Sequence, residues 1–306
     1  MTAFSDKNFK ASDYSTFRPQ YQDTWFRDII EYHSRIAENK TAIKEKSSKV
    51  LDIGCGPGEA TIPLIKYFND ITSIDLSAVM INQLKENMRR YQDENPDLKF
   101  NGYVSRSEDV SEFIEDNSID LVTAAECVHW FDIEAWFQEM GRVLKDNGTL
   151  AYWCYLDPIF LGNSKANDIY HEMAYGDEYL GRYWQKEARG KIRNLLRESH
   201  GILQDKFSDK FKDFEIDYYN PPDFPKQIKF HLNKKCKLID FINYAKTWSS
   251  GHNWIKDHSD ISEDSDEYVF NIFLKKFKDE LNWDKDTDIE LSWNSSYCLA
   301  RRIPRS

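Results

Sequence analysis

The stretch that decides the fold is Val-Leu-Asp-Ile-Gly-Cys-Gly-Pro-Gly, at residues 50–58. The residues before Gly54 are mostly apolar, as in a buried parallel strand. Glycines at alternate positions, Gly54, Gly56 and Gly58, predict a tight turn that brings bare backbone against a ligand. Residues 60–68 then predict a helix, so the turn lies at a strand-to-helix junction.

The spacing of these glycines differs from that of a dinucleotide site. The dinucleotide fingerprint is G-x-G-x-x-G, with pyrophosphate at the helix N-terminus, whereas this turn is G-x-G-x-G after Asp52. A carboxylate there repels pyrophosphate but suits a cationic amino group, and S-adenosylmethionine carries one and no phosphate. A second expected strand, residues 71–75, ends in Asp75, at the place where related sites bind ribose hydroxyls. The alternative is a glycine turn without a chemical role.

Two groups of motifs carry a resemblance to known families. The first group resembles class I S-adenosylmethionine-dependent methyltransferases: Asp-Ile-Gly-Cys-Gly-Pro-Gly at 52–58, Asp-Leu-Ser at 75–77 and Gly-Arg-Val-Leu-Lys-Asp-Asn-Gly at 141–148. The second resembles the fungal trans-aconitate methyltransferase family: Tyr-Ser-Thr-Phe-Arg-Pro-Gln-Tyr at 14–21, Glu-Cys-Val-His-Trp-Phe-Asp at 126–132 and Thr-Trp-Ser-Ser-Gly-His-Asn-Trp at 247–254. That family also includes relatives that methylate other small carboxylic acids, so the resemblance leaves the acid open.

The resemblance implies an α/β fold: a doubly wound, mostly parallel seven-stranded sheet with a helical cap insertion. Alternation of strands and helices over residues 49–154 predicts the same parallel sheet, with helices on both faces. The expected strands are 49–53, 71–75, 99–103, 119–124 and 149–154, and the expected helices are 25–37, 59–68, 78–92 and 133–144.

After residue 154 the alternation breaks. Residues 157–212 predict a helical insert rich in Trp and Tyr, which we expect to cap the sheet. Later elements are expected as strands at 214–219, 228–232 and 289–301 and helices at 238–248 and 268–281. The chain therefore divides into an N-terminal lid arm and helix (1–44), a cofactor-binding core (45–155), the cap with a late strand (156–285) and a closing strand (286–306).

Composition limits the classes of partner. The chain has 306 residues and a formal charge of −11, which argues against broad nucleic-acid binding because that needs a basic face. Its five cysteines form no C-x-x-C pair, so neither a zinc site nor a disulfide framework is indicated. It has no signal-peptide pattern and no long apolar run. We expect a cytoplasmic protein that needs no metal and no membrane.

Cofactor contacts are expected where the strands end. In the resembling family the N-terminal arm folds over the cofactor as a lid; the alternative is a surface arm covering an apolar patch. The loop after the third strand faces adenine there, which makes Ser107, Glu108 and Asp109 candidates, although Asp109 has an alternative role as a helix N-cap. The expected cofactor contacts are Tyr14, Arg18, Asp52, Gly54, Gly56, Asp75, Leu76, Ser107, Glu108 and Glu126.

The expected chemistry is methyl transfer to a carboxylate, which is ionised at neutral pH and needs orientation and desolvation rather than a base. His129 and Trp130, in the loop after the fourth strand, are the catalytic candidates, with His129 as a hydrogen-bond donor to substrate rather than a structural histidine. Arg189, Arg193 and Arg197 recur every four residues and predict one cationic stripe on a helix, suited to an anion; pairing with nearby acids is the alternative. The expected substrate contacts are Arg189, Arg193, Trp184, His252 and Tyr297.

The sequence therefore favours an S-adenosylmethionine-dependent O-methyltransferase that forms the methyl ester of trans-aconitate or a related di- or tricarboxylate. Two alternatives stay open. One is a methyltransferase that acts on a more apolar molecule, such as a lipid-like acid or a phenol, because the cap is rich in aromatic residues. The other is a non-catalytic cofactor-binding partner subunit, against which the intact glycine turn argues.

Overall fold

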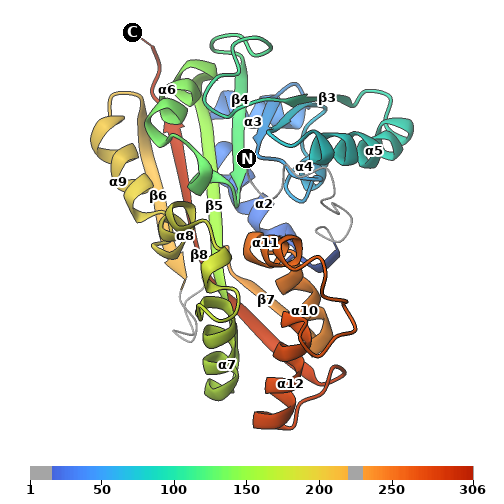
Figure 1. Ribbon diagram of the computed structural model, residues 1–306. Helices are drawn as coiled ribbons and strands as arrows, with labels where there is room; N and C mark the ends of the chain where they lie inside the picture. The colour runs from blue at the N-terminus through green and yellow to red at the C-terminus, as the bar shows by residue number, and fades with distance from the viewer. Residues whose placement is uncertain (1–15, 220–229, 306) are drawn as a thin grey trace.

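The computed structural model describes residues 16–219 and 230–305 of the chain. Within this part of the chain, one eight-stranded sheet runs in the order β3-β2-β1-β4-β5-β8-β6, and β7 also pairs with β8 (Figure 1). The strands are β1 (Lys49–Ile53), β2 (Asp70–Asp75), β3 (Lys99–Val104), β4 (Ile119–Ala125), β5 (Leu144–Phe160), β6 (Phe211–Tyr219), β7 (Leu232–Lys237) and β8 (Asp288–Arg302). The predicted α/β class is confirmed, and the sheet has one strand more than the seven that the resemblance implied.

The first five strands of this order are parallel, and the remaining pairings are antiparallel. The extra strand exists because β8 is long. Its C-terminal part pairs with β6 and its N-terminal part pairs with β7. The late strand was expected at 228–232, but β7 begins at Leu232, and residues 228–229 lie outside the described part of the chain. Its Lys-rich sequence has weak strand propensity, so pairing with β8 decides its position.

The described α-helices, with their bounds, are α2 (Asp23–His33), α3 (Ala37–Lys44), α4 (Thr61–Leu64), α5 (Ala78–Glu94), α6 (Ile133–Val143), α7 (Ser164–Tyr175), α8 (Lys186–Arg193), α9 (Arg197–Lys206), α10 (Leu238–Lys246), α11 (Ser249–Asp257) and α12 (Val269–Leu281). Three of them start at side-chain caps: Ser77 accepts from the Met80 N–H, Asp132 from the Ala135 N–H and Asn163 from the Ala166 N–H. The helix expected at 25–37 ends at His33, and α3 begins at Ala37. Asn39 of α3 donates to the His33 carbonyl across the turn between them.

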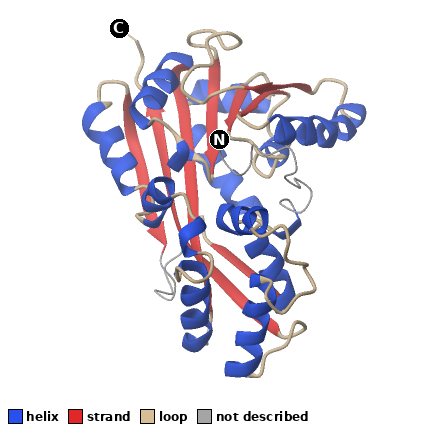
Figure 2. Cartoon of the chain, viewed as in Figure 1, coloured by secondary structure: helices blue, strands red, loops and turns tan. Residues whose placement is uncertain are grey.

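Strand residues alternate between two apolar layers, one on each face of the sheet. Val50, Trp153 and Leu299 pack into the layer with α2, α5 and the late helices α10 and α12. Their strand neighbours point the other way, into the layer with α6 and α9, and include Leu51, Tyr152 and Cys298. Figure 2 shows helices on both sides of the strands.

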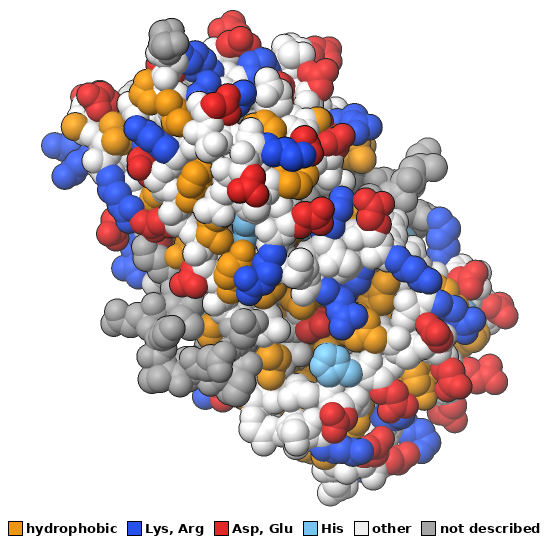
Figure 3. Space-filling model, turned by 90° about the vertical axis from the view of Figure 1, so that its left-hand side faces the viewer, with side chains coloured by type: hydrophobic (Ala, Val, Ile, Leu, Met, Phe, Trp, Pro, Cys, Tyr) orange, Lys and Arg blue, Asp and Glu red, His pale blue; other side chains and the backbone are white. Residues whose placement is uncertain are grey.

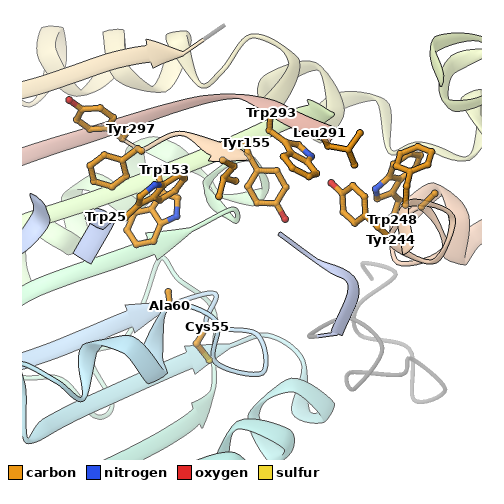
Figure 4. Close-up of a cluster of buried hydrophobic side chains, with 14 of the residues drawn as sticks. Trp25, Cys55, Ala60, Trp153, Tyr155, Tyr244, Trp248, Leu291, Trp293 and Tyr297 are labelled. Carbon is orange, nitrogen blue, oxygen red and sulfur yellow. The ribbon is translucent and has the colours of Figure 1, made fainter. Parts of the chain in front are cut away.

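The cap is built on the two longest strands. β5 continues to Phe160, across the expected boundary at residue 155, and remains paired with β8 as far as Leu291. Helices α7, α10 and α12 gather around this extension (Figure 1). A row of buried aromatic side chains follows it, from Trp153 through Tyr155 to Tyr244 and Trp248 (Figure 4). The cap therefore shares its hydrophobic core with the sheet.

His33 provides a test of this core. It is fully buried, with Nδ1 2.8 Å from Thr149 Oγ1, and burial together with Arg301 and Lys145 lowers its pKa to about 3. The unfolded chain therefore binds a proton below about pH 6.5 that the folded chain does not, so His33 costs stability as the pH falls from there. Relative to His33→Gln, the wild type should lose about 1.4 kcal/mol of unfolding free energy per pH unit below about pH 6. Urea unfolding over a pH series measures this, and a difference that is constant with pH would contradict it.

Candidate active site

The glycine turn after β1 leaves no room for side chains. Gly54, Gly56 and Gly58 all have positive φ, at +63°, +54° and +117°. A Cβ on Gly54 would lie 2.6 Å from the Cβ of Cys127, in the loop after β4. The Cys127 thiol also donates to the Ile53 carbonyl at 3.2 Å. Glycine is therefore required at position 54 both by its backbone conformation and by the contact with the β4 loop.

Asp52 supports this turn from beneath. It is completely buried, and its two oxygens accept from the Thr61 and Thr123 hydroxyls at 2.5 and 2.7 Å. Burial raises its pKa to about 6 in spite of these hydrogen bonds. Asp52 does not line the pocket beside the turn, so its expected contact with the cofactor's amino group stays a prediction. A sequence pattern cannot distinguish a carboxylate beside a turn from one below it.

Asp75 lies at the open side of the same turn. Its Oδ2 accepts from the Gly56 N–H at 3.0 Å and its Oδ1 from the Ser77 N–H at 2.8 Å. Burial raises its pKa above the ordinary value. Leu76 beside it is 55% exposed, which is unusual for a large apolar side chain in this chain. A buried carboxylate next to an exposed leucine offers an acceptor for hydroxyls and an apolar surface for a flat ring.

These residues line one pocket, which we call the glycine pocket. It brings together most of the residues expected to hold the cofactor: Gly54, Gly56, Asp75, Leu76, Ser107, Glu108 and Glu126, with Trp130 and Phe131 at one wall. Glu108 accepts from the Asp132 N–H at 3.0 Å, whereas Asp109 bonds only locally, to Ser111. No helix begins after Asp109 in this described stretch, so its alternative role as a helix N-cap is wrong, and its side chain holds a local turn. Ser107 and Glu108, which line the pocket, remain the candidates for the adenine edge.

A second pocket, the arginine pocket, adjoins the first between the β4 loop and the cap. Glu126 and Trp130 line both pockets. Eight other residues that matter here come from the N-terminal segment, the β4 loop, β5, helices α7, α8 and α10, and the connections just before α8 and α11. They are Arg18, His129, Asp157, Tyr170, Trp184, Arg189, Tyr244 and Trp248. Arg18 was expected at the cofactor, but the structure places it in this pocket. Its Nε and Nη2 donate to Thr247, at 3.0 and 2.9 Å.

The predicted arginine stripe does not exist. Helix α8 ends at Arg193 and α9 begins at Arg197, and Leu195 and Leu196 between them have positive φ. Two residues with this left-handed backbone end one helix before the next begins. Arg189 and Arg193 of α8 both lie over Tyr175, whereas Arg197 of α9 lies over Tyr218. Of the three, only Arg189 lines the arginine pocket.

Arg189 is fixed by an acidic and aromatic cluster. Its Nη2 lies 2.5 Å from Asp157 Oδ1, and its guanidinium lies 4.0 Å from the centre of the Trp184 ring. Tyr170 and Tyr175 also donate to Asp157. The Arg189 Nε is buried and has no hydrogen-bond partner among the described residues. Sequence reasoning missed Asp157, because its partners come from α7 and α8 and no local motif marks it.

His129 is buried in the wall of the arginine pocket, and its Nδ1 has no partner among the described residues. Burial, with Arg189, Arg18 and Lys191 nearby, lowers its pKa to about 3. The imidazole is therefore neutral at physiological pH. It can donate or accept one hydrogen bond in the pocket, but it is a weak proton acceptor.

The remaining predicted substrate contacts divide between the arginine pocket and other parts of the fold. Trp184 lines the arginine pocket, as expected of a substrate contact. Tyr297 stacks on Phe230 in the core, with ring centres 4.3 Å apart, and His252 is not among the described residues lining either pocket. Tyr297 and His252 were expected at the substrate because an aromatic side chain can line a pocket or fill the core. Only the three-dimensional fold shows which of these roles it has. Tyr14, and most of the expected lid, lie outside the described residues.

Among residues 16–219 and 230–305, no group of three or more His, Cys, Asp or Glu side chains could hold a metal ion. None of the helices in that part of the chain combines the length and apolar character needed to cross a membrane. All five cysteines are free thiols. On the face shown in Figure 3, basic and acidic side chains are interspersed.

Comparisons with known proteins agree with this geometry. Residues 51–152 match the family model of a methyltransferase domain. A probable S-adenosylmethionine-dependent methyltransferase of Saccharomyces cerevisiae, CRG1, is 28% identical over 98% of both chains. A Dictyostelium discoideum protein described as a methyltransferase is 27% identical over 83% of this chain and 81% of its own. The comparisons support a class I S-adenosylmethionine-dependent methyltransferase.

The solved structures add the fold. A protein from Anaeromyxobacter dehalogenans described as a type II methyltransferase superposes with a TM-score of 0.63, at 19% identity, over 94% of this chain and 100% of its own. The methyltransferase uses S-adenosylmethionine as its cofactor, and the glycine pocket fits that molecule. Its glycine turn allows close backbone approach, Asp75 offers acceptors for ribose hydroxyls and exposed Leu76 offers a surface for adenine. These individual roles remain predictions.

Replacing Asp75 tests the glycine pocket. Asp75→Ala removes the acceptor that we expect to bind ribose and that also holds the Gly56 N–H, so S-adenosylhomocysteine binding should weaken by about 1–3 kcal/mol. Asp70→Ala, at the opposite end of the same strand, is the matched control and should leave binding unchanged. Calorimetry measures both. Equal affinities for the two variants and the wild type would remove Asp75 from the cofactor site.

Proposed function

We propose that this methyltransferase forms the methyl ester of a small organic acid, with trans-aconitate or a related di- or tricarboxylate as the leading candidate. One observation carries the proposal. The pocket that shares Glu126 and Trp130 with the glycine pocket contains two arginines, Arg18 and Arg189, with little solvent exposure. Arginine binds carboxylates through charge-assisted, often bidentate hydrogen bonds.

The local charge matters because the whole chain repels anions. With a formal charge of −11, the protein's field opposes the approach of a carboxylate, so cations at the site must overcome it. Arg189 is held in place by Asp157 and Trp184, so little side-chain entropy is lost when it binds a ligand. The buried Arg189 Nε and the His129 Nδ1, which have no partner among the described residues, are further candidates to bind substrate oxygens.

The chemistry suits a nucleophile that is already ionised. S-adenosylmethionine supplies an electrophilic methyl group on a sulfonium. A carboxylate oxygen can attack that methyl carbon directly, giving the ester and S-adenosylhomocysteine, without loss of a proton. His129, whose pKa lies near 3, is poorly suited to act as a base. The residues of the arginine pocket then contribute orientation and exclusion of water.

A second candidate substrate is more apolar. Aromatic side chains make up much of the wall of the arginine pocket: Trp130, Tyr170, Trp184, Tyr244 and Trp248. This wall would favour a lipid-like acid or a phenol over a tricarboxylate. A screen of methyl transfer from labelled S-adenosylmethionine to di- and tricarboxylates, long-chain acids and phenols separates the two. Transfer only to phenols would overturn the carboxylate proposal.

Substitution of the arginines tests the proposal within the pocket. Arg189→Gln and Arg18→Gln each remove one charge-assisted contact, so KM for the acid should rise by the equivalent of about 1.5–3 kcal/mol, with cofactor affinity retained. Arg193→Gln is the matched control, because Arg193 is on the same helix but does not line the pocket. Its KM should equal that of the wild type.

Thermal unfolding must accompany these kinetics, because Arg189→Gln leaves Asp157 without its charged partner and can lower stability. A folded Arg189→Gln enzyme with the wild-type KM for every accepted acid would contradict the role of Arg189. The same result for Arg18→Gln would remove the observation on which the carboxylate proposal rests.

A further inference from the structure

Glu126 occupies the junction of the two pockets in a strained backbone conformation. It follows β4 directly and has φ = +56°, in the left-handed region that residues other than glycine rarely adopt. Two hydrogen bonds to β5 hold it there. Its N–H donates to the Trp153 carbonyl at 2.9 Å, and its Oε2 accepts from the Tyr155 N–H at 2.7 Å. Strain of this kind is found mostly at functional positions.

The groups around Glu126 come from several elements. Arg18 of the N-terminal segment and Arg189 of α8 favour the ionised form of Glu126. Asp157 of β5, the ion-pair partner of Arg189, lies in the same pocket. His129 beside Glu126 is neutral. Burial keeps the thiols and the phenol near Glu126, which belong to Cys127, Cys154 and Tyr244, in their protonated forms. Burial outweighs the arginines and raises the pKa of Glu126 to about 7.

We propose that Glu126 binds the acid substrate as a neutral carboxyl group, which takes up one proton from solvent as the acid enters and donates a hydrogen bond to it. This inference rests on the proposed function. The proton returns to solvent when the ester leaves and the site refills with water. Glu126 would thus bind the substrate in addition to lining the glycine pocket.

The reason is electrostatic. Two carboxylates within one poorly solvated site cannot both stay ionised at low cost, so one of them acquires a proton. An ordinary carboxylic acid has a pKa near 4, well below that of Glu126, so the proton goes to Glu126 and the substrate keeps the charge that makes it nucleophilic. Arg18 and Arg189 then face the carboxylate of the substrate and Asp157, the ion-pair partner of Arg189, beside the neutral Glu126.

Calorimetry can count this proton. Trans-aconitate is titrated into the complex with S-adenosylhomocysteine, which carries no sulfonium charge, at about pH 8 in buffers of different ionisation enthalpy. We expect uptake of nearly one proton per acid bound, and a dissociation constant that rises up to about tenfold per pH unit as the pH increases further. Glu126→Gln can keep the bond to the Tyr155 N–H, and it should bind the acid with no proton uptake and no such pH dependence.

A control variant tests whether the proton uptake belongs to Glu126. Glu134→Gln replaces a carboxylate that lines neither pocket, and it should retain the proton uptake. Thermal unfolding shows whether each variant is folded, and the wild-type count stands even where a variant is not.

The possible failures are distinguishable. If trans-aconitate or another carboxylate binds and is methylated but the wild type takes up no proton, the role of Glu126 is wrong and the proposed function stands. If Glu126→Gln still takes up a proton, the titrating group is another one and the inference is again overturned. If no carboxylate in the screen is bound or methylated, the proposed function fails, and this inference fails with it.

Discussion

The site depends on one close contact, between Gly54 of the turn after β1 and Cys127 of the loop after β4. A side chain at position 54 would overlap Cys127 at 2.6 Å, and the Cys127 thiol bonds the Ile53 carbonyl on the other side. This contact sets how close the two loops can lie. The turn presents Gly56 to Asp75, and the loop presents Glu126 and Trp130 to both pockets. The glycine pocket could not keep its shape if the contact were lost, because it has walls from both loops, and the arginine pocket shares the β4 loop with it.

The sequence predicted what is encoded locally and missed what depends on distant pairing. The strand, the glycine turn and Asp75 lie within one short stretch, and their pattern indicates their geometry. The arginine stripe failed because a four-residue repeat is no proof of a continuous helix. Leu195 and Leu196 take left-handed conformations that no propensity would predict, since both are good helix formers. Tyr297 and Asp157 show the same limit: one is core and the other part of a pocket, and only the packing of β5, β8 and the cap helices decides which.

The long strands explain why the arginine pocket lies where it does. Because β5 and β8 extend beyond the rest of the sheet, the cap helices pack on the same apolar layer as the core and cannot be an independent unit in energetic terms. The aromatic row that follows β5 in Figure 4 runs from Trp153 to Tyr244 and Trp248 at the arginine pocket. Substitutions in that row would therefore change stability and substrate fit together, and measurements of activity there need a parallel measurement of folding.

Charge balance links this architecture to the chemistry. The arginine pocket holds two guanidinium groups, of Arg18 and Arg189, and two carboxyl groups, of Glu126 and Asp157. Asp157 forms a direct ion pair with Arg189. Glu126 is therefore the carboxyl group whose protonation can change when a charged substrate enters the pocket. Methyl transfer from a sulfonium to a carboxylate removes one positive and one negative charge from the site. In a poorly solvated pocket that loss is favourable, because the two charges are no longer held away from water. An adjustable carboxyl group at the junction can accommodate both the charged and the uncharged state, whereas a permanently ionised residue could be matched to only one of them.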